Sequence, residues 1–177
     1  MNRSALSAKG ITYAGLFIAL SIVLTRTMSF MITVAGIQGV RIGFGGIPII
    51  LSGIVLGPGL GALVGAASDV IGYMLFPNGP FFPGFTLTAA LSGALPAIFL
   101  GLIDRNKSYQ FTKIIIAVAI SDIITSLFLD TTWLVIMYHR AISVLLPARI
   151  TARMIMIPVN SYLIYSLVRY IPGLKTR

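Results

Sequence analysis

RIGFGGIPIILSGIVLGPGLGALVGAASDVIGYMLFPNGPFFPGF, residues 41–85, is the stretch that decides the fold. Two apolar runs within it meet at Leu56-Gly57-Pro58-Gly59. Glycine supplies unusual backbone dihedrals and proline stops a helix, so this tetrapeptide predicts a tight turn between two short helices. Asp69 stands inside the second run, where a charge needs a partner or a task.

The composition of the whole chain is that of an integral membrane protein. Of its 177 residues, 57% are hydrophobic and only 10% are charged. The mean hydropathy of +0.98 lies outside the range of soluble domains. No polar linker separates a second domain, so residues 1–177 are expected to form a single membrane-embedded, substrate-binding domain. The absence of cysteine excludes disulfides and thiol chemistry.

Six apolar segments approach the ~20 residues that a membrane helix needs, and they predict an all-α bundle of six transmembrane helices. Basic residues precede the first segment, separate the fourth from the fifth and follow the sixth. By the positive-inside rule both termini are cytoplasmic. Orientation thus explains most of the net charge of +9, and no nucleic acid partner is expected. The segments are 9–29, 41–57, 59–76, 84–103, 112–138 and 144–170.

Five arginines in the outward half are not explained by orientation. Charges within membrane segments normally face a bundle interior or a wet cavity. The pattern therefore predicts an outward-facing basic cavity, ringed by outer loops near 30–40, 76–85 and 137–147, the first of which is a candidate lid. The arginines are Arg26, Arg41, Arg140, Arg149 and Arg153.

RIGFGGIPIILSGIVLGPGLGALVGAASDVIGYMLFP followed by GPFFPGFTLTAALSG resembles the S-components, the substrate-binding subunits of energy-coupling factor (ECF) vitamin transporters, and above all their folate-specific branch. The resemblance covers most of the chain and is strongest over residues 41–96. It implies a subunit of a prokaryotic cell membrane that captures folate outside and passes it to a transmembrane coupling protein and two ATPase subunits. No enzymatic activity and no cofactor are implied, and no G-x-x-x-x-G-K-[ST] motif for ATP is present.

A folate site needs cations for the two glutamate carboxylates, aromatic walls for the rings and acceptors for the pterin N–H groups. Guanidinium groups bind carboxylates through paired, charge-assisted hydrogen bonds, which makes Arg26, Arg149 and Arg153 the candidates. Arg149 and Arg153 are four residues apart and share a helix face. Pairing with acidic residues or with lipid headgroups is the alternative. For Arg41 we favour a structural role at the helix end.

Acidic residues within the apolar segments are candidate acceptors for the pterin. Asp130, close to Trp133 in the sequence, is the better candidate. Asp69 is a second one, although we favour a structural pairing for it. Asp122 lies deeper, near the middle of the membrane, where it is either protonated or paired, and its role is left open. Asn160 is a further polar residue inside an apolar segment, a candidate for holding the carbonyl that Pro158 frees.

Four aromatic residues are candidates for stacking on the ligand rings, with an interfacial aromatic belt as the alternative. They are Trp133, Tyr138, Phe82 and Phe85. His139 is a candidate for a hydrogen bond to a neighbour or to the ligand. A lone histidine without cysteine makes a poor metal site, so no metal is expected.

Small residues spaced four apart permit close helix packing. Gly61 and Gly65 in the third segment are expected to pack within the bundle. Gly15 and Ala19 in the first segment match the ridge that, in the family resembled, docks on the coupling protein. They are candidates for partner binding, with packing inside the bundle as the alternative.

Other functions remain as alternatives. An S-component for thiamine would favour an acidic site, and pantothenate has no rings to meet the aromatic residues. An intramembrane enzyme acting on an anionic lipid needs a nucleophile, base or metal cluster, and none is recognisable. A channel or structural bundle leaves the outward arginines unexplained.

Overall fold

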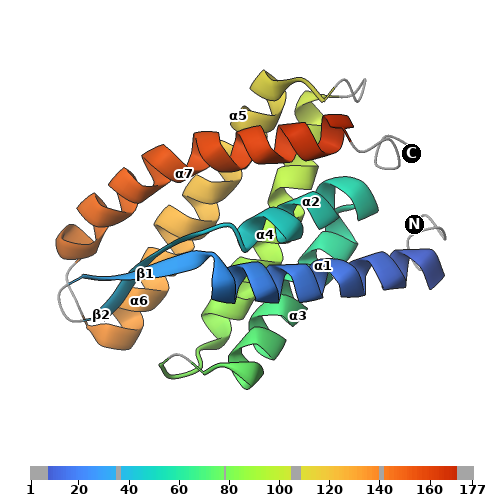
Figure 1. Cartoon of the computed structure of the whole chain (residues 1–177). Coiled ribbons are helices and arrows are strands. Elements are labelled where there is room, and N and C mark those ends of the chain that lie inside the picture. Colours follow the sequence, from blue (N-terminus) through green and yellow to red (C-terminus); the bar gives the residue numbers. More distant parts are fainter. Residues whose placement is uncertain (1–7, 35–36, 78, 105–108, 140–141, 171–177) are drawn as a thin grey trace.

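The computed structural model describes residues 8–34, 37–77, 79–104, 109–139 and 142–170, with all of their side chains except those of 31–34, 37–41, 144–145 and 170. The chain forms a helical bundle with one β-hairpin (Figure 1). In chain order the elements are α1 (Ala8–Thr27), β1 (Ser29–Val34), β2 (Ile37–Gly43), α2 (Gly46–Leu56), α3 (Pro58–Leu75), α4 (Pro83–Ile103), α5 (Phe111–Asp122), a π-helical segment (Ile123–Leu129), α6 (Asp130–Tyr138) and α7 (Ile142–Tyr170).

The six predicted helical segments are confirmed. The fifth is continuous, because α5, the π-helical segment and α6 follow one another without a break from Phe111 to Tyr138. The predicted turn is present as well: Gly57, with φ of 98°, ends α2, and Pro58 starts α3. Only glycine adopts that φ without strain, and proline suits the first turn of a helix. The start of α1 and the end of α7 lie at the same end of the bundle (Figure 1).

Within the described part of the chain, four helices are long and apolar enough to cross a membrane. They are α1, α3, α4 and the continuous helix Phe111–Tyr138. Many large apolar side chains on the outside of the bundle are exposed, among them Leu16, Phe128 and Met154. Exposed apolar surface of this extent is unusual for a soluble monomer and is expected where lipid is the solvent.

The connection between α1 and α2 is a β-hairpin, where the sequence analysis expected a loop. Strand β1 pairs antiparallel with β2, with Ser29 opposite Gly43 and an irregularity after Ile32. The β-branched residues of both strands favour this extended conformation. Helix α2 consequently begins at Gly46 and not near residue 41. Both strands contact α7, so the hairpin lies across one end of the bundle (Figure 1).

Glycines bring α2, α3 and α4 into backbone contact. A Cβ added to Gly53 would lie 1.9 Å from the carbonyl oxygen of Gly93, and one added to Gly93 would lie 2.0 Å from that of Gly61. A Cβ on Gly65 would lie 2.0 Å from the carbonyl oxygen of Ala89 in α4. The predicted packing of Gly61 and Gly65 inside the bundle is therefore confirmed.

Candidate functional site

A cavity of about 390 Å³ lies among the helices, within the size range of small-molecule sites. All the helices and the π-helical segment contribute to its wall, as do the loop before α4 and Ser29 and Gly43 of the hairpin. Its charged lining residues are Arg26, Arg149, Arg153, Asp69, Asp122 and Asp130. The formal charges of these six described side chains cancel, and the side chains of Arg41 and Arg140, which the arginine pattern also assigns to the cavity, are not described.

Arg26 lies in the last turn of α1 and ties this helix to α3. Its Nη2 donates hydrogen bonds to the carbonyl oxygens of Gly72 at 2.9 Å and Phe76 at 2.7 Å. The guanidinium carbon also lies 4.9 Å from the centre of the Phe76 ring. These groups carry no formal charge, and the ion pairs of the described residues do not include Arg26. Its positive charge is therefore available to an anion in the cavity.

Arg149 is buried and bound to the helix opposite. Its Nη1 donates to the carbonyl oxygen of Ser126 at 2.6 Å and lies 3.4 Å from Thr131 Oγ1. Asp130 and Asp122 are the acidic side chains whose charges act on this guanidinium. Ser126 belongs to the π-helical segment, a rare conformation that is frequent at functional sites. The protein itself thus occupies much of the hydrogen-bonding capacity of Arg149.

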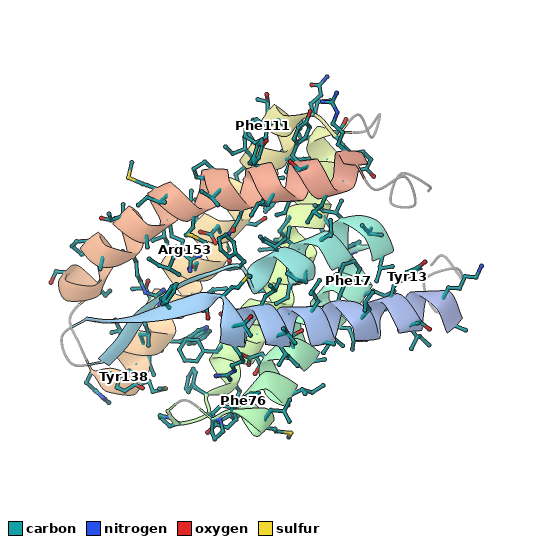
Figure 2. All side chains as sticks on the ribbon, in the orientation of Figure 1. Tyr13, Phe17, Phe76, Phe111, Tyr138 and Arg153 are labelled. Carbon is teal, nitrogen blue, oxygen red and sulfur yellow. The ribbon has the colours of Figure 1, made fainter. Side chains whose placement is uncertain are left out.

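Arg153, four residues further along α7, forms an ion pair with Asp122. The distance from Nη1 to Oδ1 is 3.2 Å, and both side chains are 21% exposed. Figure 2 shows Arg153 beneath α7, toward the inside of the bundle. This pairing gives Asp122 a partner that the sequence analysis left open.

Asp69 joins α3 to α4, because Thr86 Oγ1 donates to its Oδ2 at 2.7 Å. Asp130 interacts with Arg149, and Thr88 is its hydrogen-bond partner. Asp122 and Asp130 flank the π-helical segment, and both line the cavity. The wider π turn lowers the rotation per residue, which brings the two carboxylates to the same side of the helix.

Aromatic side chains form the outer part of the wall. Three of the four aromatic candidates line the cavity: Phe82, Phe85 and Tyr138. The rings of Phe82 and Phe85 are 6.0 Å apart between centroids. Figure 2 shows Tyr138 at the end of α6 near the hairpin. Tyr73 Oη donates to the carbonyl oxygen of Gly79 at 3.1 Å, which anchors the loop that carries Phe82.

Trp133 and His139 lie outside the described lining of the cavity. The Trp133 indole packs 5.6 Å from the Phe82 ring, and its Nε1 donates to Thr88 Oγ1 at 3.1 Å. Trp133 therefore stands behind Phe82, in a supporting position. His139 is exposed and has φ of 51°, the left-handed conformation that ends α6.

Two arginine predictions have no described geometry: Arg140 lies outside the described residues, and the side chain of Arg41 is not described. In the described part of the chain no group of three or more potential metal ligands occurs. On α1, Gly15 and Ala19 are exposed, and nothing lies within 4 Å of a Cβ added to Gly15.

Unpartnered polar atoms in the wall are the feature that sequence reasoning missed. Ser68 Oγ, Asp122 Oδ2 and Asn160 Oδ1 are buried, have no hydrogen-bond partner and belong to residues that line the cavity. Such groups are rare in folded proteins and call for an explanation. The only sequence signal was the position of Asp122 and Asn160 deep inside apolar segments.

Comparison with known proteins accounts for this architecture. The family model "ECF transporter, substrate-specific component" matches residues 9–168. The chain belongs to this family. A substrate-specific component is part of a transporter, so the chain is a membrane transport protein and not an enzyme.

Individual relatives of this substrate-specific component are similar over most of their length. The folate transporter FolT of Clostridium novyi (strain NT) is 39% identical over 153 residues, which cover 86% of this chain and 84% of the relative. The folate transporter FolT of Leuconostoc mesenteroides is 26% identical over 156 residues, covering 85% and 83%. A crystal structure of FolT bound with folic acid superimposes with a TM-score of 0.78 at 29% identity, covering 91% of this chain and 94% of that one.

Proposed function

We propose that this chain is the folate-binding subunit of an ECF-type vitamin importer in a prokaryotic cell membrane. It captures folate in the cavity from the outer face and delivers it through a transmembrane coupling protein. Two partner ATPases supply the energy, so the chain itself needs no cofactor. The identity to folate transporters and the likeness to a structure bound with folic acid support this substrate class.

The composition of the cavity is the observation that carries the proposal. It joins the unpaired charge of Arg26, the rings of Phe82, Phe85 and Tyr138, and buried acceptor atoms. Folate offers one chemical group for each: carboxylates, aromatic rings and pterin N–H groups. Guanidinium–carboxylate hydrogen bonds and ring stacking supply both affinity and orientation.

The outer face of α1 supports a partner site in the same machine. Gly15 and Ala19 leave a shallow apolar surface on which another helix can approach closely. We place the coupling protein there.

Folic acid titration of the detergent-purified chain, followed by the fluorescence of Trp133, tests the proposed substrate. Because the indole packs on Phe82, which lines the cavity, we expect a saturable change in emission. Trp133→Phe removes the signal, and calorimetry on that variant shows whether binding persists without it. Binding of pantothenate or thiamine, with none of folic acid or its reduced forms, would overturn the substrate while keeping the family.

A further inference from the structure

The π-helical segment leaves one backbone carbonyl without its usual partner. In an α-helix each N–H donates to the carbonyl four residues earlier. At the end of the π-helical segment the N–H of Asp130 donates instead to the carbonyl of Thr125, five residues earlier. When the four-residue pattern resumes in α6, the next N–H along the chain reaches past the carbonyl of Ser126. The return from a π turn to an α turn thus skips Ser126.

Arg149 of α7 supplies the donor that this carbonyl lacks. Its Nη1 lies 2.6 Å from the Ser126 carbonyl oxygen, and the bond is buried, because Arg149 is 8% exposed and Ser126 is 5% exposed. The same nitrogen lies 3.4 Å from Thr131 Oγ1 in the first turn of α6. A buried carbonyl without a donor is costly, above all in a helix that crosses a membrane. A π turn at this place therefore needs a donor from outside its own helix.

We propose that Arg149 is a positioning residue that holds the π-helical segment in its wide turn, an inference that rests on the proposed function. The guanidinium takes the place of the missing backbone N–H and thereby fixes the direction in which α6 presents its side chains. Asp130, Leu134 and Tyr138 of α6 line the cavity. Arg149 thus acts on the ligand through the opposite helix and not through a bond to a ligand carboxylate.

The π turn absorbs one residue, and this defines what its loss would do. If the segment closed into an α-helix at its present length, every later residue would turn by about 100° and move about 1.5 Å along the axis. If one residue were removed, the segment could become α-helical while α6 keeps its place, and the Ser126 carbonyl would regain a backbone N–H. Phe128 is the residue to remove, since it is 69% exposed on the outside of the bundle.

The test combines Arg149→Met with a deletion of Phe128, made alone and together in the detergent-purified chain. Arg149→Met alone should lower the melting temperature. It should also weaken the binding of folic acid and of pteroic acid, which lacks the glutamate, by the same factor of roughly 10, because a buried carbonyl loses its donor. With Phe128 deleted, the loss of affinity caused by Arg149→Met should be at least roughly threefold smaller. Calorimetry well below each melting temperature ensures that lost stability alone does not lower the affinity.

Two further variants serve as controls. Phe128→Ala removes the same side chain without shortening the helix, so Arg149→Met should have its full effect in that background. Arg149→Lys keeps a donor and a charge, and it should retain more of both affinities than Arg149→Met.

Equal effects of Arg149→Met with and without the deletion would overturn this inference. A larger loss for folic acid than for pteroic acid would do the same, because it would show that Arg149 binds the glutamate directly. This comparison of ligands decides the matter even if the deletion variant does not fold. If the unmodified chain binds neither ligand, the proposed function falls, while the melting temperatures still test whether Arg149 holds the segment.

Discussion

At the scale of single residues, Arg26 combines a structural contact with an unpaired charge. Its Nη2 donates to the carbonyl oxygens of Gly72 and Phe76, and Arg26 also lines the cavity. We expect Arg26→Ala to weaken the binding of folic acid by roughly 10- to 100-fold, because a charge-assisted hydrogen bond to a carboxylate is lost. Pteroic acid lacks the glutamate, so the variant's affinity for it should fall much less. Calorimetry with both ligands measures the difference.

A lysine variant separates the charge of Arg26 from its hydrogen bonds to α3 and the residue after it. Arg26→Lys keeps the charge but loses the fork that reaches two carbonyl oxygens. Folic acid should then bind to Arg26→Lys more tightly than to Arg26→Ala. Equal weakening of folic and pteroic acid in Arg26→Ala would mean that Arg26 acts only by holding the end of α3.

At the scale of elements, the three-helix contact at Gly53, Gly61 and Gly93 leaves no room for a side chain. In Gly93→Ala the new Cβ would lie 2.0 Å from the carbonyl oxygen of Gly61, so α3 and α4 must move apart. We expect a lower melting temperature in detergent, since overpacking of a tight contact costs ~1–3 kcal/mol. Gly101→Ala is the control on the same helix, because nothing lies within 4 Å of its added Cβ. Equal melting of both variants would contradict this account.

Element positions were predictable from the sequence where one strong signal decided them. Apolar length and the Gly57-Pro58 turn place α3 and α4 within a residue of their observed bounds. The hairpin was missed because residues 29–43 are short, moderately apolar and rich in glycine, which is equally typical of a loop. The π-helical segment leaves no trace in an apolar sequence, since its residues are ordinary helix residues with one altered turn.

The candidate site was predictable in its residue types and less so in its pairings. Arginines, carboxylates and phenylalanines do gather at one cavity, because charges in apolar segments seek the interior. Which charged side chains form pairs depends on the direction in which each helix points them. The π-helical segment changes that direction between Asp122 and Asp130. Arg153 therefore pairs with Asp122, while Arg149 donates to the carbonyl oxygen of Ser126.

At the scale of the whole molecule, α1 presents two separate surfaces. Its C-terminal half contributes Ser21, Thr25 and Arg26 to the cavity. Gly15 and Ala19, about two to three turns before Arg26, are exposed, and nothing lies within 4 Å of a Cβ added to Gly15. Ligand capture and partner docking can therefore be altered independently.

Gly15→Leu and Ala19→Leu test the docking surface. Filling the shallow stripe should prevent the close approach of a partner helix, because small residues are what permits it. We expect folic acid binding to the purified variants to stay unchanged while uptake of labelled folate into cells that carry the full transporter falls at least roughly tenfold, the effect of losing about 1.4 kcal/mol of association energy. Leu20→Phe, about 100° around the helix from Ala19, enlarges a side chain beside the stripe and should keep uptake. Normal uptake in both leucine variants would place the partner on another face, because a bulky side chain in the middle of a helix contact cannot be accommodated without separating the helices.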